Sequence, residues 1–198
     1  MNGTTVIVAG GGANLTSLCC ALERLGAAAE VSADSATIAA AQRVILPGVG
    51  APRPAMRQLT ATGLTQLLPR LRQPVLGICL GMQLLYTSSE EGAAECLGIL
   101  PGRITRLTPA PGRPVPHMGW NTLEELRPDP LLEGIGAGEH VYFVHGYAAA
   151  PGAATLAQTE YGGALSAVVR RGNFCGTQFH PERSGDAGAR LLANFLRL

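Results

Sequence analysis

Three short apolar runs, each followed within three residues by a glycine, constrain the fold of this 198-residue chain more than any other feature. They lie at residues 6–8, 43–46 and 75–78, and helical patterns of apolar residues separate them. Continuous apolar runs of this length are typical of strands buried on both faces of a parallel sheet. Strands that alternate with helices therefore predict an α/β fold, with a mostly parallel central sheet flanked by helices.

The pattern changes from about Gly102 onward. Shorter alternating runs, separated by Gly and Pro turns, lie at residues 103–107, 141–147, 164–169 and 174–179. Such runs are typical of antiparallel strands, so we expect a smaller antiparallel or mixed portion here. A closing helix is expected at residues 185–198. The sequence has no internal repeat and no long linker, and we expect a single domain that spans residues 1–198.

The charged residues argue against nucleic acid as a partner. All fifteen basic residues are Arg, fourteen residues are acidic, and the formal net charge is +1. They are scattered along the chain and form no basic stripe. No apolar run approaches the roughly 18 residues that a membrane helix needs, and the N-terminal sequence lacks the basic flank and cleavage site of a signal peptide. We therefore expect a soluble, cytoplasmic protein that binds neither nucleic acid nor membrane.

The cysteines point to chemistry rather than to cross-linking. There are five, an odd number, and none forms a C-x-x-C pair, so neither a disulfide framework nor a zinc module is expected. Cys79 lies in the sequence Gly77-Ile78-Cys79-Leu80-Gly81, between an apolar strand and a helical pattern, which is the context of a nucleophile elbow. The start of a helix favours the thiolate, which is the form that attacks. The alternative for Cys79 is a small buried hydrophobe at the end of a core strand.

The sequence His180-Pro181-Glu182 supplies a base for Cys79. Proline disfavours helix for the residue before it, so His180 is expected to be extended. In an extended chain residues 180 and 182 project to the same side, which brings the imidazole and the carboxylate together. A His oriented by a Glu takes a proton from a thiol and returns it to a leaving amine. We therefore interpret Cys79, His180 and Glu182 as a catalytic triad rather than as a solvated strand end beside a core cysteine.

Acyl transfer also needs hydrogen-bond donors for the oxyanion. The backbone N–H of Leu80 is one candidate. The loop at residues 47–50 ends a neighbouring strand at the same edge of the sheet, and its peptide near Val49 or Gly50 is the second. The alternative for this loop is an ordinary turn from strand to helix.

A metal site is the other chemistry that these side chains could support. It would combine Cys79, His180 and Glu182 with His117 or His145. This set has the ligand spacing of no known zinc pattern, so we expect neither a metal nor an organic cofactor.

The residues around both motifs resemble a known family. Residues 77–85 (GICLGMQLL) and 177–182 (TQFHPE) resemble class I, triad-type glutamine amidotransferases. Within that family, residues 47–51, 116–121 and 141–145 resemble the glutaminase subunits of imidazole glycerol phosphate synthase, an enzyme of histidine biosynthesis. The resemblance covers roughly residues 44–184 and implies the α/β fold of class I glutamine amidotransferases.

The resemblance implies an activity and a role for each residue of the triad. The family hydrolyses glutamine to glutamate and ammonia. By position, Cys79 is the nucleophile, His180 is the general base and acid, and Glu182 orients the imidazole.

Further residues take binding roles by the same resemblance. Gln83 and Glu91 hold the glutamine substrate. The Val49–Gly50 peptide completes an oxyanion hole together with Leu80.

The resemblance also implies a partner, the (β/α)₈ barrel cyclase subunit of a heterodimer. Ammonia passes through the barrel to a bound ribulosyl aminoimidazole carboxamide nucleotide, and imidazole glycerol phosphate and aminoimidazole carboxamide ribotide are formed. The residues expected at this interface are Asn14, Pro116, His117, Met118, Trp120, Asn121, Tyr142 and Arg183. Exposed aromatic residues are enriched at interfaces, although Trp120 also suits a core and His117 a structural role.

Two other functions stay open. The chain could be the glutaminase of another synthase, in the pyridoxal phosphate or anthranilate pathway, although residues 116–121 favour the histidine pathway. It could also be a catalytically silent regulatory subunit. The loop around Pro52 and the N-terminal turn, which both differ from the usual pattern of the resembled family, would suit this role. The intact triad motif favours an active enzyme.

Overall fold

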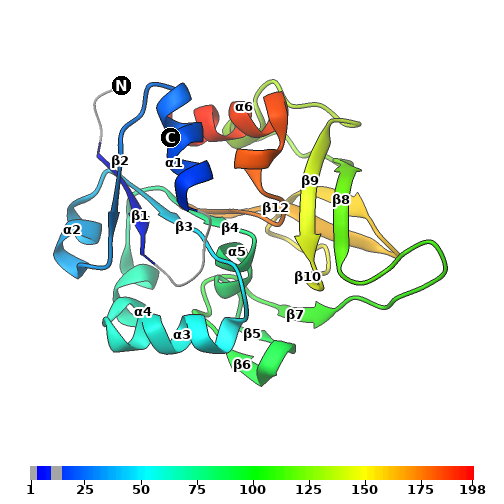
Figure 1. Ribbon diagram of the computed structural model, residues 1–198, viewed down its shortest axis with the longest axis horizontal. Helices are drawn as coiled ribbons and strands as arrows, with labels where there is room; N and C mark the ends of the chain where they lie inside the picture. The colour runs from blue at the N-terminus through cyan, green and yellow to red at the C-terminus, as the bar shows by residue number, and fades with distance from the viewer. Residues whose placement is uncertain (1–3, 10–14) are drawn as a thin grey trace.

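A seven-stranded sheet with the strand order β11-β12-β13-β4-β3-β1-β2 forms the centre of the computed structural model, which describes residues 4–9 and 15–198 (Figure 1). Five neighbouring strands are parallel: β2 (Ala29–Ser32), β1 (Thr5–Val8), β3 (Arg43–Leu46), β4 (Val75–Ile78) and β13 (Phe174–Thr177). Two antiparallel strands, β12 (Ala164–Arg171) and β11 (Thr155–Glu160), complete the other edge. The predicted parallel sheet is confirmed.

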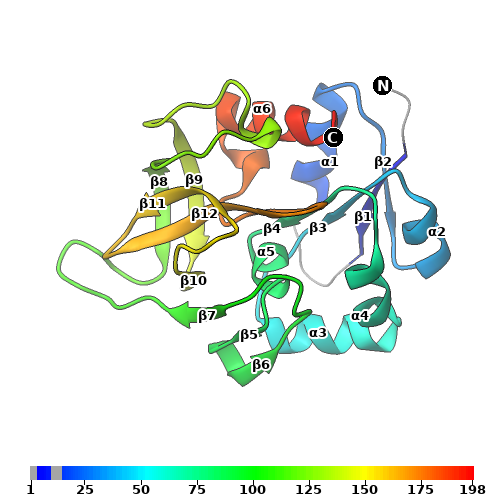
Figure 2. The ribbon, with the colours of Figure 1, turned by 180° about the vertical axis from the view of Figure 1, so that it is seen from behind.

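Helices cover both faces of this sheet, as Figures 1 and 2 show. On one face lie α1 (Leu15–Arg24) and α6 (Gly185–Phe195). On the other lie α2 (Ser35–Ala40), α3 (Pro52–Ala61), α4 (Leu64–Leu67), η1 (Leu68–Arg70) and α5 (Leu80–Leu84). Among the described residues no helix is both long and apolar enough to cross a membrane.

Side chains that alternate along β3 explain how the sheet holds both layers. Val44 and Leu46 belong to the core under α2 to α5, whereas Ile45 belongs to the core under α1 and α6. Successive side chains of a strand point to opposite faces, so an uninterrupted apolar run buries residues on both sides at once. Strands β1 and β4 share this pattern, because each is also covered on both faces.

Two smaller sheets extend from this frame. One has the order β10-β7-β5-β6 and contains β10 (Tyr147–Ala149), β7 (Arg103–Arg106), β5 (Ser88–Ser89) and β6 (Ala94–Glu95). The other is an antiparallel ribbon of β8 (His117–Thr122) and β9 (His140–His145). Three further 3₁₀ turns lie between neighbouring elements: η2 (Glu91–Ala93) between β5 and β6, η3 (Pro130–Leu132) between β8 and β9, and η4 (Pro181–Arg183) between β13 and α6.

Some expected elements differ in the structure. The run at residues 174–179, expected in the antiparallel or mixed portion, forms β13, which has mixed pairing: it is parallel to β4 and antiparallel to β12. The reason is the turn at Gly172, which reverses the chain after β12 and gives β13 the direction of β4. The last helix also ends earlier than expected, at Phe195.

Glycines allow α5 to approach the ends of β3 and β4 at backbone distance. A Cβ atom on Gly77 would lie 2.7 Å from the carbonyl group of Gly81, and one on Gly48 would lie 2.9 Å from Gly81 N. A Cβ on Gly81 itself would overlap the carbonyl oxygen of Leu46. Only residues without a side chain fit here, so these glycines set the position of the turn between β4 and α5.

We expect Gly81→Ala to lower the free energy of unfolding by about 3 kcal/mol or more, because the new methyl group meets rigid backbone rather than a flexible side chain. Urea unfolding followed by circular dichroism measures this. The matched control is Gly136→Ala, since a Cβ at Gly136 meets no atom within 4 Å. Equal stabilities for the two variants would contradict the argument.

Candidate active site

Cys79 occupies a strained turn between β4 and α5. Its backbone dihedrals are φ 54° and ψ −111°, and positive φ is rare for a residue with a side chain. Strain of this kind persists only where the surrounding structure imposes it, and it is frequent at functional sites. The predicted strand–turn–helix context of Cys79 is present. Its side chain is largely buried, with 7% of the residue exposed.

His180 and Glu182 form an ion pair next to this turn. His180 Nδ1 lies 2.9 Å from Glu182 Oε1, and both side chains are less than 10% exposed. His180 is extended, as predicted, with φ −95° and ψ 99°. The expected alternation of residues 180 and 182 along an extended chain is wrong, because residues 181–183 form the 3₁₀ turn η4. The turn brings the carboxylate back to the imidazole.

Electrostatics favour a protonated imidazole at His180. Burial opposes the charge, but interactions with Cys79 and Glu182 outweigh it and raise the pKa of His180 from 6.5 to about 10. His180 Nε2, on the other side of the ring from Glu182, is buried and has no hydrogen-bond partner within the described part of the chain. An imidazolium held this way stabilises a neighbouring thiolate.

The sulfur of Cys79 has two further polar neighbours. Gln178 Nε2 and the carbonyl oxygen of Val144 each lie 3.8 Å from Cys79 Sγ. Gln178 Oε1 in turn accepts a hydrogen bond of 3.0 Å from Gln83 Nε2, which also donates to the carbonyl of Tyr147 at 2.9 Å. Sequence reasoning assigned no role to Gln178, although it lies two residues before His180 in the same motif.

A cavity of about 370 Å³ opens at Cys79. Its size lies in the range of small-molecule sites. Its lining comes from the turn at Cys79, the loop after β3, η2 and the segment that joins β9 to β10, and it consists of Val49, Gly50, Cys79, Leu80, Gln83, Glu91, Pro116, Val144, His145, Gly146, Tyr147 and His180. The structure therefore brings the expected oxyanion and glutamine-binding residues to one cavity with Cys79 and His180.

The positions of Leu80 and Glu91 suit those expected roles. Leu80 is the first residue of α5, where backbone N–H groups have no acceptor within the helix. Burial raises the pKa of Glu91. Its neighbour Glu90 holds the η2 segment on β7, because one carboxylate oxygen accepts from Arg106 N at 2.9 Å and the other pairs with Arg103 at 3.0 Å.

A second, smaller cavity of about 150 Å³ adjoins the first. Val49, Val144 and His180 line both. The rest of its lining is mainly apolar and comes from α1, the loop after β3, β4 and η4: Leu18, Pro47, Gly48, Ile78, Glu182 and Arg183. His180 therefore stands in the wall between two cavities.

The comparison with known proteins decides the family. The model of the family "Glutamine amidotransferase class-I" matches residues 8–198. The chain belongs to this family. Among the described residues of this amidotransferase, no group of three His, Cys, Asp or Glu side chains could hold a metal ion.

Relatives of this amidotransferase are similar to it in sequence along almost the whole chain. The chain is 55% identical to the imidazole glycerol phosphate synthase subunit HisH of Xanthomonas euvesicatoria over 192 residues, which cover 97% of this chain and 96% of the relative. It is 52% identical to the subunit HisH of Xylella fastidiosa with the same coverage. A solved structure described as a glutamine amidotransferase superposes with a TM-score of 0.76, at 24% identity and 98% coverage of both chains, and supports the fold.

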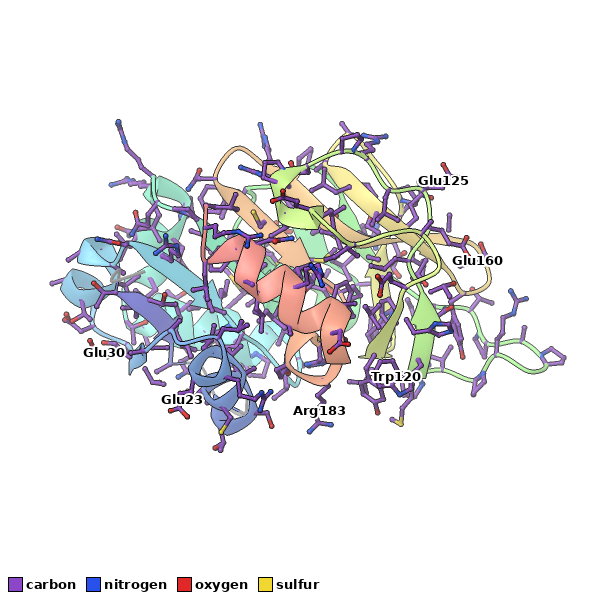
Figure 3. The ribbon with its side chains drawn as sticks, turned by 90° about the horizontal axis from the view of Figure 1, so that it is seen from above. Glu23, Glu30, Trp120, Glu125, Glu160 and Arg183 are labelled. Carbon is purple, nitrogen blue, oxygen red and sulfur yellow. The ribbon has the colours of Figure 1, made fainter. Side chains whose placement is uncertain are left out.

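The residues expected at a partner interface lie around the β8–β9 ribbon and η4. Met118 and Trp120 are 63% and 56% exposed, and the Trp120 ring packs edge-on against Tyr142 at 5.9 Å. Figure 3 shows Trp120 and Arg183 pointing outward on the same side of the amidotransferase. Asn14 lies outside the described residues.

The other expected interface residues are less exposed or take part in internal contacts. Pro116 is exposed but also lines the larger cavity. Asn121 is half-buried and donates to the carbonyl of Glu160 at 2.9 Å. His117 is buried, and its ring stacks between the rings of Phe143 and Tyr161. The ring centroids lie 4.8 Å and 3.8 Å from that of His117.

His117 and His145 form a buried chain of neutral rings. His145 Nδ1 lies 2.9 Å from the carbonyl of Tyr147, which only accepts, so this nitrogen carries the proton. His145 Nε2 then accepts from His117 Nδ1 at 3.1 Å. Burial lowers the pKa of each histidine to about 4, and for His145 coulombic interactions with the His117 and His180 rings lower the pKa further. The hydrogen-bonded pair of His117 and His145 supports the segment from β9 to β10 that lines the larger cavity.

These two histidines predict acid sensitivity. Their pKa values are about 4 in the folded protein and 6.5 in the reference state, so the unfolded chain binds more protons between these values. The free energy of unfolding should therefore fall as the pH drops from 6.5 towards 4, and His117→Phe should make this fall smaller. Urea unfolding at several pH values measures it. The control is His140→Gln at an exposed histidine, and an unchanged pH dependence in His117→Phe would contradict the prediction.

Proposed function

We propose that this chain is the glutaminase subunit of an imidazole glycerol phosphate synthase in histidine biosynthesis. The observation that carries the proposal is the His180–Glu182 pair beside the strained Cys79 turn, at the mouth of the larger cavity. The HisH subunits that are 52% to 55% identical to the chain support the choice of synthase.

The proposed reaction begins with attack of the Cys79 thiolate on the carboxamide carbon of glutamine. Backbone N–H groups of Leu80 and of the Val49–Gly50 peptide stabilise the oxyanion that forms. His180 gives its proton to the leaving nitrogen, ammonia departs, and a thioester remains on Cys79.

Hydrolysis of the thioester completes the cycle. His180 takes a proton from water, the resulting hydroxide attacks the thioester carbon, and the second oxyanion forms in the same place. Its collapse releases glutamate and returns Cys79 to the thiolate, with His180 protonated again. Glu182 keeps the same imidazole tautomer and orientation in both halves because it occupies Nδ1 throughout.

Gln83 and Glu91 are proposed to hold the glutamine in this cavity. Glu91 is half-buried in the lining and suits the α-amino group of the substrate, since a carboxylate at low exposure gains from a cationic partner. The amide nitrogen of Gln83 is already committed to Gln178 and Tyr147, which fixes the orientation of its side chain.

The proposed partner is a (β/α)₈ barrel cyclase that forms a heterodimer with this chain and receives the ammonia. The smaller cavity supports this route, because it continues from His180 towards η4 and Arg183 with a mainly apolar lining. The exposed residues Met118, Trp120 and Arg183, together with the half-buried Tyr142, supply an apolar and basic surface on that side. We place the complex in the cytoplasm, where a reducing environment keeps thiols such as Cys79 free.

We expect Cys79→Ala to abolish glutamate release from glutamine, a loss of roughly 10⁴-fold or more, because no other group replaces the nucleophile. Glutamate is measured with the purified chain alone and with a barrel cyclase and its nucleotide ligand. Cys20→Ala, at an exposed cysteine, is the control and should keep the activity. Glutamate release by Cys79→Ala would refute the mechanism, and an inactive wild-type chain in every mixture would favour a silent binding subunit.

We expect Trp120→Ala to weaken binding of the cyclase by about 30-fold, near 2 kcal/mol, because exposed Trp residues at interfaces are frequent hot spots. Glutamate release by the isolated chain should not change, since Trp120 does not line the cavity at Cys79. Isothermal titration calorimetry measures the binding. The control is Val31→Ala on β2, at another exposed apolar residue. Equal binding by both variants would place the partner on a different face.

A further inference from the structure

Ser184 carries a buried hydroxyl group directly beside the triad. It follows η4 and precedes α6, and only 1% of the residue is exposed. A Ser at this position ordinarily caps the helix by accepting a hydrogen bond from a backbone N–H of the first turn. Here the hydroxyl makes no such bond to α6, so it serves another purpose.

The hydroxyl links the backbones of His180 and Tyr142. Ser184 Oγ donates to the carbonyl of His180 at 2.7 Å and accepts from Tyr142 N at 2.9 Å. In return, His180 N donates directly to the carbonyl of Tyr142 at 3.0 Å. Opposite residues of an antiparallel pair exchange two such backbone bonds. One of the two is direct here, and Ser184 Oγ relays the other.

The bridge ties His180 to β9, which faces the proposed partner through Tyr142. Neighbouring contacts leave the segment little freedom, because the carbonyl of His180 also accepts from Arg183 N at 3.0 Å. On the other side α6 packs directly on η4, where a Cβ on Gly188 would overlap the carbonyl oxygen of Pro181. The His180 backbone is thus held between β9 and α6, and Ser184 is the one side chain in the bridge.

We propose that Ser184 is a positioning residue for His180, whose hydroxyl completes a backbone bridge to β9 and so holds the imidazole between Cys79 and Glu182. This inference rests on the proposed glutaminase function for its kinetic consequence. Ser184 touches neither the sulfur nor the substrate cavity, so it acts only through His180. Loss of the hydroxyl leaves the Tyr142 N–H without its acceptor and frees one side of the His180 carbonyl.

The test compares Ser184→Ala with Ser166→Ala. Ser166 is the control, since it is fully buried and its hydroxyl also bonds to the carbonyl of Ala150 at 3.0 Å and to Thr155 Oγ1 at 2.8 Å, and none of these three residues lines the cavity at Cys79. We expect Ser184→Ala to lower kcat for glutamine about tenfold, with KM within about twofold, because a shift of the base by a fraction of an ångström slows proton transfer. Ser166→Ala should keep kcat while losing similar thermal stability, and Ser184→Thr, which keeps the hydroxyl, should recover most of kcat.

A second readout does not depend on glutaminase activity. The rate of alkylation of Cys79 by iodoacetamide, followed by mass spectrometry of its peptide, reports the thiolate that His180 stabilises. We expect its pH profile to move to higher pH in Ser184→Ala and to stay in place in Ser166→Ala. An unchanged profile with unchanged kcat would overturn the inference.

The outcomes separate this inference from the proposed function. An inactive wild-type chain whose alkylation profile still moves in Ser184→Ala would refute the glutaminase and support the bridge. If Ser184→Ala does not fold, hydrogen exchange of the wild-type chain decides: the Tyr142 and His180 amides should exchange as slowly as core amides, and fast exchange at either would overturn the bridge.

Discussion

The contact of backbone with backbone behind Cys79 is the constraint on which the site depends. Gly48, Gly77 and Gly81 let α5 lie against the ends of β3 and β4 at distances that no side chain permits. The chain must then turn sharply at Cys79, which adopts a positive φ and presents its sulfur at the edge of the sheet. A cysteine that simply ended a core strand would need none of these glycines, so the packing itself favours the nucleophile over the buried hydrophobe.

Charge and burial are balanced around this turn in a way that assigns roles to the histidines. His180 has a carboxylate at one ring nitrogen, and its pKa is raised to about 10, whereas His117 and His145 have only neutral partners and their pKa values fall to about 4. All three residues are less than 10% exposed. The opposite pKa shifts of His180 and of the other two histidines are therefore set by the neighbouring groups and not by depth.

Local sequence predicted the parallel sheet and the grouping of Cys79 with His180 and Glu182, because both depend on short motifs: apolar runs for the parallel strands, and a cysteine between glycines followed far along the chain by His180 and Glu182. What it could not supply depends on residues distant in sequence. The pairing of β13 with β4 and the contact of Gln178 with Cys79 each join segments about 100 residues apart, and the hydrogen bond of Ser184 to Tyr142 appears only when β9 is placed beside η4. The 3₁₀ turn at residues 181–183 was missed because a proline signals an extended residue before it and says little about the residues after it.

The alternation of β9 has a consequence for how the ribbon can move. Tyr142 and Val144 are half-buried on one side of this strand, whereas Val141, Phe143 and His145 are buried on the other. Tyr142 is hydrogen-bonded to His180, Val144 lines both cavities, and His145 is hydrogen-bonded to His117 on β8. Residues on both sides of the strand therefore make specific contacts. A shift of β9 by one residue would exchange its two sides and break all three sets of contacts at once. A displacement of the β8–β9 ribbon that kept these contacts would therefore have to move both strands as one unit, with the register of β9 against His180 preserved.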